Sequence, residues 1–526
     1  MHWALEIVEI VDMICGEIRS STPTATHSDG GDIIFEGPLR HLAVLARTST
    51  VFHNTALDHL WNTQDTILNL LRCMPNDLWR INDGLGVPKI SLLRSIASSD
   101  WQRPLIYSHR VKSFLMHQPE SSDFLQALSL FLLGDCIFPN LQNLRWLSPL
   151  PSSFHHISLF ITPSIRHLSL LITGSFSQLS ILSNLGAKCP ALTHVAIYIA
   201  TSQGTFPTLS TFARSLMHVQ SLTIPLVDRA ALEHLSQLPH LQSLQFTGSF
   251  TPEFSLTPTL ASIPFPALIH LTMYSLQCGT TLLTWSKHLT LKTLNIRGIQ
   301  EVPTKIDIRR FYAAIALHCA HPHLQEIIVG TSYDDVTPPG ADEIDTYSVG
   351  RDMIEPLFPF ANLVTVSLIH PVGFDLDDAT ILKMARSWPR LQSLFLTARP
   401  FHHMPSRVTL EGVYAFAEHC PRLRTLGITV DATSVPKIRI DKEQPRVTQL
   451  TLATLHVALS LIGNAGRVAV FLSAIFPELR WIQTFYDGVL AEHEDEEEEE
   501  AELEVPAEQL ESHKKWKAVE DALRQD

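Results

Sequence analysis

A short pattern of apolar and polar positions recurs along most of this chain. It begins with a Cys or aromatic residue, often followed by Pro, and continues as Leu-x-x-Leu-x-apolar, as in Cys420–Ile428. Its first Leu-type position falls at residues 141, 165, 192, 219, 241, 268, 291, 324, 363, 391, 423, 447 and 479. Because side chains alternate between the two faces of a strand, each copy predicts a short strand with one buried face.

The spacing of the copies predicts the fold class. Steps of 22 to 39 residues, most of them in the twenties, are typical of leucine-rich repeats. Helical patterns lie between the copies, for example at residues 179–185, 311–317 and 413–417. We therefore expect an α/β protein whose repeats form a horseshoe solenoid, with parallel strands on the concave face and helices on the convex face.

Three apolar stripes at helical spacing precede the repeats. Residues 3–18 carry the first stripe; a second begins at Pro38 with apolar positions 39 to 46, and after a break near residues 48–50 a third continues from 52 to 61. The Ser-, Thr- and Gly-rich stretch at residues 20–37 predicts a loop between them. Helices with so few apolar residues cannot form a stable core alone, so we expect them to need a partner.

The helical segment resembles a known family. Ile7-Val8-Glu9-Ile10-Val11 resembles the opening of an F-box, and Leu42–His53, followed by Leu60-Trp61, resembles its later helices. Residues 99–113 include Asp100-Trp101, Tyr107 and Arg110-Val111, and they are similar to the linker of F-box-like proteins abundant in fungi. Residues 373–391 resemble a late repeat of the same family.

This resemblance implies a substrate-recognition subunit of a Skp-cullin-F-box type ubiquitin ligase, with a Skp-type adaptor, a cullin ligase and an unknown protein substrate as partners. For adaptor contact it indicates Ile7, Val8, Ile10, Val11, Ile14, Leu42, Leu45, Leu57 and Trp61, some of which must form the core of the helical domain. For substrate contact, the expected concave face offers Gln142, Arg145, Arg166, His167, His194, Gln242, Gln245 and Arg424. The alternative is a protein-binding scaffold outside any ligase, its degenerate F-box, with Val8 where the family usually has Pro, acting as a solenoid cap.

The expected domains are a helical domain (1–61), a helical linker (62–137), the repeat solenoid (138–487) and an acidic tail (488–526). Ten acidic residues lie between Glu492 and Glu504, so the remainder of the chain carries −14 + 10 = −4 formal charges. Like charges repel, and the tail is expected to be disordered, with a short helix from Leu510 to Leu523. Residues 331–343 predict either a flexible insertion or a loop that gates the concave face.

Other chemistry finds little support in the sequence. The seven Cys form no C-x-x-C pair, and Cys189, Cys319 and Cys420 precede repeat strands, which favours burial and a cytoplasmic or nuclear protein. The stretch His318–His323 holds three His and one Cys, but Pro322 interrupts the helix that would align them, so we expect no metal or cofactor. We find no catalytic motif and no basic stripe, and expect no enzyme, nucleic-acid partner or membrane span; a hydrolase whose triad assembles only in space is the remaining alternative.

Overall fold

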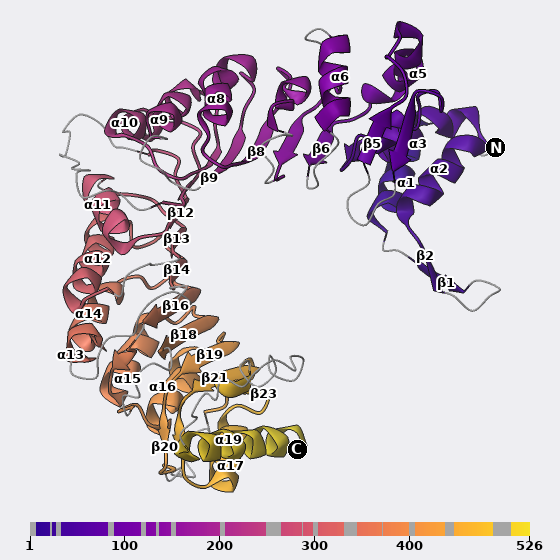
Figure 1. Ribbon diagram of the computed structural model, residues 1–526. Helices are drawn as coiled ribbons and strands as arrows, with labels where there is room; N and C mark the ends of the chain where they lie inside the picture. Colours follow the sequence, from indigo (N-terminus) through magenta and orange to yellow (C-terminus); the bar gives the residue numbers. More distant parts are fainter. Residues whose placement is uncertain are drawn as a thin grey trace. The chain divides into compact units, whose positions relative to one another are not determined.

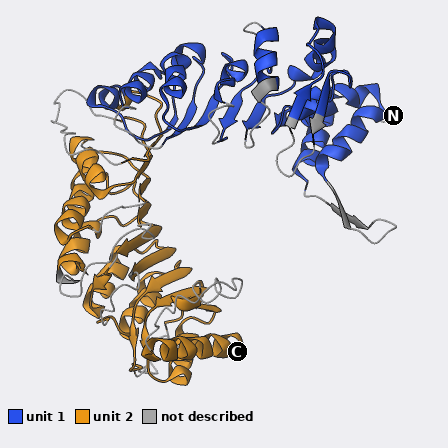
Figure 2. Ribbon diagram, viewed as in Figure 1, with its two compact units in different colours: residues 1–234 blue, residues 235–526 orange. Residues whose placement is uncertain are grey.

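The protein folds into two compact α/β units, residues 1–234 and 235–526 (Figure 2). In each unit the helices lie along one side of a set of parallel strands (Figure 1). The computed structural model describes residues 7–21, 24–27, 33–82, 89–116, 122–132, 136–148, 154–199, 206–248, 265–286, 288–297, 303–330, 344–370, 372–398, 406–436, 447–487 and 507–525.

The first unit begins with three helices, α1 (Val8–Ser20), α2 (Pro38–Thr48) and α3 (Thr50–Trp61). Their core consists of Val11, Cys15, Leu42, Ala46 and Ala56. Ser49 begins α3, since its hydroxyl accepts a hydrogen bond from the backbone N–H of Val51. Between α1 and α2, where the sequence predicts only a loop, strands β1 (Thr24–His27) and β2 (Ile33–Glu36) form an antiparallel hairpin.

Six parallel strands follow in this unit, in spatial order β3-β6-β7-β8-β9-β10. They are β3 (Thr63–Gln64), β6 (Ser113–Met116), β7 (Asn143–Trp146), β8 (His167–Ile172), β9 (His194–Ile199) and β10 (Ser221–Ile224). The helices between them are α4 (Leu68–Leu71), α5 (Ser98–Ser108), α6 (Ser122–Leu132), η2 (Ile157–Phe160), α8 (Phe176–Lys188) and α9 (Phe206–Ser215), with a β4 (Trp79–Asn82)/β5 (Lys89–Leu92) hairpin. Helix α10 (Arg229–Ser236) follows β10.

The strand ladder begins earlier than residue 138, where the sequence predicts it. The carbonyl of Asn62 accepts hydrogen bonds from the backbone of Lys112 and Ser113, and the carbonyl of Lys112 accepts from Gln142. Trp61 and Val111 thus hold the place that Leu141 holds in the next repeat, two residues before the strand. Because this place is taken by Trp61 and Val111 instead of Leu, the Leu pattern in the sequence does not reveal these two copies.

The second unit contains nine parallel strands in its main sheet, in the order β11-β12-β13-β14-β16-β18-β19-β21-β23. They are β11 (Ser243–Phe246), β12 (His270–Met273), β13 (Thr293–Ile296), β14 (Glu326–Val329), β16 (Thr365–His370), β18 (Ser393–Ala398), β19 (Thr425–Ile428), β21 (Thr454–Ala458) and β23 (Trp481–Thr484). The helices are α11 (Leu276–Ser286), α12 (Lys305–His318), α13 (Ile344–Tyr347), α14 (Arg351–Ile354), η4 (Glu355–Leu357), α15 (Asp378–Ser387), α16 (Leu410–His419), α17 (Ala465–Ile475) and α19 (Ala507–Gln525). Short strands β15 (Val349–Gly350) and β17 (Phe374–Asp375) pair with each other, as do β20 (Asp431–Ala432) and β22 (Leu461–Ile462).

The predicted register holds at twelve of the thirteen Leu-type positions, since the strand starts two residues after each of them. The position at Val447 is wrong, because β21 starts at Thr454 and Leu452 takes the buried place. Gln449 fills the turn instead, where its side-chain amide donates to the carbonyl of Leu423 at 2.7 Å. Along most strands buried residues alternate with half-buried or exposed ones, and we call the side that carries the latter the open face.

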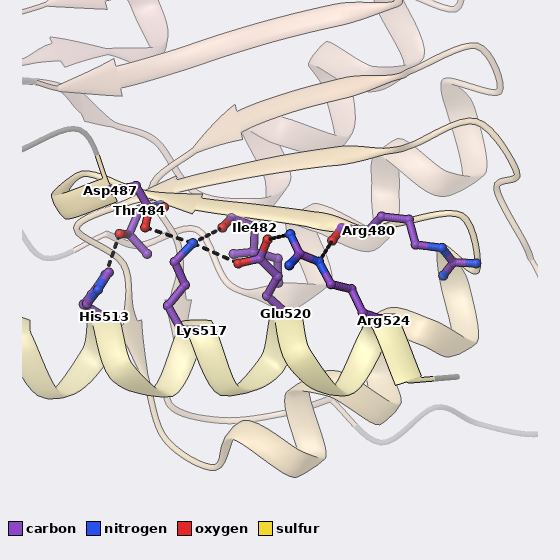
Figure 3. Close-up of polar contacts among 8 residues, drawn as sticks. All are labelled: Arg480, Ile482, Thr484, Asp487, His513, Lys517, Glu520 and Arg524. Carbon is purple, nitrogen blue, oxygen red and sulfur yellow. Dashed lines mark hydrogen bonds and ion pairs between the residues drawn. The ribbon is translucent and has the colours of Figure 1, made fainter. Parts of the chain in front are cut away.

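Helix α19 closes the last repeat and packs against α17 and β23 (Figure 3). Its own residues Trp516, Val519 and Leu523 are buried, and the indole N–H of Trp516 donates to the carbonyl of Ser460 at 2.9 Å. Lys517 donates to the carbonyl of Ile482 at 3.0 Å and also pairs with Asp487 and Glu520. This part of the predicted acidic tail is therefore a packed helix; the acidic residues from Glu492 to Glu504 and the insertion at 331–343 lie outside the described residues.

Candidate functional site

The structure sorts the nine residues predicted for adaptor contact. Val11 and Leu42 are fully buried in the three-helix core, and Trp61 is only 9% exposed. Leu45 and Leu57 are half-buried and pack against the same core. The other four, Ile7, Val8, Ile10 and Ile14, lie at the start of α1 or on it and are half-buried or exposed.

The helical domain exposes more apolar surface than these residues alone. On α1, Val8 is 66% exposed and Met13 is 64% exposed. On α2, Leu39 is 51% exposed and Val44 is 55% exposed. Met13 and Val44 were missed by the sequence reasoning because they fall outside the buried stripe of their helices, and an apolar residue on a polar helix face is the signal that would have found them. We call Val8, Met13, Leu39 and Val44 the helical apolar set.

Side chains from residues 99–113, which lead from α5 to β6, hold the helical domain against the start of the strand ladder. Arg110, just after α5, donates to the backbone carbonyl of Asn54 at 3.1 Å and to its side-chain oxygen at 3.0 Å, and it forms an ion pair with Asp58. The ring of Tyr107 stacks on Trp61, with ring centroids 4.6 Å apart. Both contacts are made to α3, so they fix the helical domain to the start of the ladder.

Asp100 lies in the first turn of helix α5 and is held by Arg94. Its carboxylate accepts from the backbone N–H of Ala97 at 2.8 Å and from two guanidinium nitrogens of Arg94 at 2.7 and 3.0 Å. The hydrogen bond from Arg94, assisted by that from Ala97, lowers the pKa of Asp100 to about 2. Arg94 also donates to Asp77 at 2.9 Å. These hydrogen bonds give Asp100 a structural role: they hold the first turn of α5 to Arg94.

The open face of the first unit brings together five of the predicted substrate-contact residues. Arg145 lies on β7, His167 on β8 and His194 on β9, and all three are exposed. Gln142 and Arg166 stand directly before β7 and β8, where the carbonyl of Gln142 accepts from the backbone N–H of Arg166 at 2.8 Å. The rings of His167 and His194 are neighbours on adjacent strands, 4.4 Å between centroids. Burial, then His194 and Arg166, lowers the pKa of His167 below its usual value.

The remaining three predicted residues lie in the second unit and are spread along its sheet. Gln242 is exposed and Gln245 half-buried beside β11, and Arg424 is exposed before β19. On the same face, the ring of Phe395 lies over Gly427, where any side chain would collide with it, and reaches within 4.9 Å of the ring of His456. Sequence reasoning missed this pair because it depends on a Gly in one strand leaving room for the ring of the strand before it.

The Cys and His residues considered as thiol or metal sites are packed within the structure. Cys189, Cys319 and Cys420 are buried, and burial raises the pKa of Cys189 to about 11 and of the other two to about 12. His321 packs its ring against Phe360, with centroids 4.6 Å apart. Among the described residues, no three His, Cys, Asp or Glu side chains are gathered so as to hold a metal ion. Nor does that part of the chain contain a helix both long and apolar enough to cross a bilayer.

Comparisons with protein families and with curated proteins give no further information about function. No protein-family model matches the chain, and no curated protein matches it either. Two features of the chain are candidates for binding a partner: the helical apolar set on α1 and α2, and the open face of the sheet.

Proposed function

We propose that this chain is the substrate-recognition subunit of a Skp-cullin-F-box type ubiquitin ligase. Helices α1 to α3 bind a Skp-type adaptor, and the open face of the repeat sheet holds a protein substrate. The chain itself makes and breaks no bond. It raises the concentration of the substrate near the ligase by binding both at once.

The observation that carries the proposal is the exposure of apolar side chains on a very small helical domain. Val11 and Leu42 form its core, while Val8, Met13, Leu39 and Val44 are all more than half exposed. Single exposed apolar residues are ordinary on a protein surface, but several on two short neighbouring helices favour a docking surface. Arg110 and Tyr107 join this domain to the strands, which a receptor requires in order to present its substrate.

The experiment is co-purification of the full chain with a Skp-type adaptor. The test variant carries Val8→Asp and Ile10→Asp, because both side chains lie on α1 outside the buried core. The matched control carries Met217→Asp and Leu317→Asp, which are 61% and 71% exposed elsewhere in the chain. We expect capture by the wild type and the control, and at least a tenfold loss in the test variant. Folded wild type that captures no adaptor would end the ligase proposal.

One observation favours the alternative, a binding scaffold whose helices only cap the solenoid. The side chain of Arg19 on α1 donates to the hydroxyl of Thr63 at 2.5 Å, and α3 runs directly into β3, the first strand of the ladder. The helices thus lie against the end of the sheet, as a cap does. Under this alternative the adaptor is not captured, whereas the open face still binds its protein partner.

A further inference from the structure

In the part of the first unit that the structure describes, the open face carries three cations that form no ion pair. Lys112 before β6, Arg145 on β7 and Arg166 before β8 are all exposed. Within the described residues, none of the three side chains forms an ion pair. Arg94 and Arg110 in the same unit behave differently, since each is paired with a carboxylate. Charges left unpaired on a strand surface are available to a ligand.

Among the described residues, the strands of this face carry no Asp or Glu on their open side. On β6 to β10, and at the residue before each of these strands, no open-face position is Asp or Glu; the positions carry Lys, Arg, His, small polar residues and a few apolar residues. The whole chain, by contrast, has a formal net charge of −14. A surface that collects cations and excludes carboxylates, on a protein of the opposite net charge, is complementary to an acidic ligand.

The spacing of the cations fits an extended peptide. Lys112 and Arg166 hold equivalent places two strands apart, with Gln142 between them in the backbone ladder, which places them roughly 10 Å apart. Arg145 stands on the middle strand, three residues beyond Gln142, again about 10 Å along the chain direction. Tyr198 is 40% exposed on the same face, on β9, two strands from Arg145, and Arg and Tyr are the residues that most often anchor a protein interface.

We propose that Lys112, Arg145, Arg166, His167, His194 and Tyr198, the basic face, bind an extended acidic segment of a partner protein. This rests on the proposed function and names the chemical class of its substrate. Carboxylates of the segment pair with the two guanidinium groups and the ammonium group, and its backbone lies across the strands. Three permanent cations are too few for the long basic track that a nucleic acid needs, so a protein segment is the better fit.

The test uses the full chain and a fluorescein-labelled twelve-residue peptide of alternating Glu and Gly, measured by fluorescence polarisation at low salt. The test variant carries Arg145→Gln and Arg166→Gln, which keep polarity and remove two charges. The control carries Arg390→Gln and Arg422→Gln, two exposed arginines in the turns before β18 and β19. We expect the peptide to bind the wild type and the control, and to bind the test variant at least tenfold more weakly.

Three results would overturn the proposal: no binding of the Glu peptide, equal binding by the test variant, or equal binding of a Gln–Gly peptide by the wild type. Tighter binding of a twenty-nucleotide single-stranded DNA, lost in the same variant, would replace the protein segment with a nucleic acid. Adaptor capture is measured on the same variants. If the Glu peptide binds as expected and no adaptor is captured, the ligase proposal fails while the basic face stands; the reverse result rejects only the basic face.

Discussion

His370 at the end of β16 is a titratable group enclosed by the fold. Its ring is completely buried, and its Nε2 lies 2.8 Å from the hydroxyl oxygen of Tyr312 on α12. Phe374 packs against the other side, with ring centroids 5.4 Å apart. Because a charged imidazolium cannot be solvated there, burial lowers the pKa of His370 to about 3.

This burial predicts a loss of stability in acid. The unfolded chain binds a proton at His370 below about pH 6.5, whereas the folded chain does not until about pH 3. Stability is therefore lost as the pH falls through this window, and His370 contributes about 2 kcal/mol of the loss between pH 8 and pH 5. Urea unfolding at both pH values measures it.

Two variants isolate the effect of His370 from that of the other histidines. In His370→Gln the loss between pH 8 and pH 5 should be smaller by about 2 kcal/mol. Tyr312→Phe keeps the buried imidazole, so it should lower stability at both pH values and keep the pH dependence. Identical pH dependence in the wild type and His370→Gln would contradict the prediction.

At the scale of single residues, the sequence predicts which face of a helix is apolar, but not which of its apolar residues the neighbouring helices bury. Apolar spacing predicts a stripe on α1, and Val11 is indeed fully buried, yet Ile10 beside it is only half-buried. The difference arises because α2 and α3 cover the Val11 side of the helix alone, and periodicity holds no information about neighbouring helices. The sequence also cannot predict that Arg145 and Arg166 form no ion pair, because that depends on which carboxylates the fold brings near them.

At the scale of elements, repetition made most strands predictable. Twelve strand positions follow from the Leu pattern because every copy buries the same side chains against its neighbours. The failure at β21 has a local cause: Val447, Leu450 and Leu452 all fit the pattern, and only packing decides that Leu450 is 64% exposed while Leu452 is buried. The β1–β2 hairpin was missed because its strands flank a polar, Gly-rich stretch.

Arg110 connects two elements, and its removal should weaken their contact. It reaches Asn54 and Asp58 on α3 from the end of α5, and its side chain is only 18% exposed. Arg110→Ala should therefore lower the free energy of unfolding by about 1–3 kcal/mol. We expect faster proteolysis between α3 and α5, measured by limited digestion. Arg103→Ala, an exposed arginine on α5 itself, is the control and should leave the digestion rate unchanged.

Helix α19 should act as the C-terminal cap of the second unit. Trp516 is 1% exposed and bonded to Ser460, so Trp516→Ala should cost about 3–5 kcal/mol locally. Solenoid repeats are stabilised by their neighbours, and the effect should spread from α19 to β23 and β21 before it reaches β12. Hydrogen exchange by strand measures this gradient. Leu317→Ala, at a 71% exposed residue on α12, should change exchange far less, and uniform exchange along the unit would contradict the capping role.

At the scale of the whole molecule, the two proposed surfaces depend on different forces. The helical apolar set buries hydrocarbon, which salt does not weaken. The basic face relies on exposed charges, whose attraction is screened over about 10 Å at 0.1 M salt and about 3 Å at 1 M. The two binding activities should therefore respond oppositely to ionic strength, although both reside in residues 1–234.

Raising the salt from 0.05 to 0.5 M should weaken binding of the Glu–Gly peptide at least tenfold and leave adaptor capture unchanged or slightly stronger. Both quantities are measured on one preparation of the full chain. The Arg145→Gln, Arg166→Gln variant should lose most of the salt dependence of peptide binding, because the charges that salt screens are gone. The Val8→Asp, Ile10→Asp variant should keep it while losing the adaptor. Peptide binding that is indifferent to salt would mean that the open face holds its ligand by apolar contact, for which Phe395 beside His456 is the next residue to mutate.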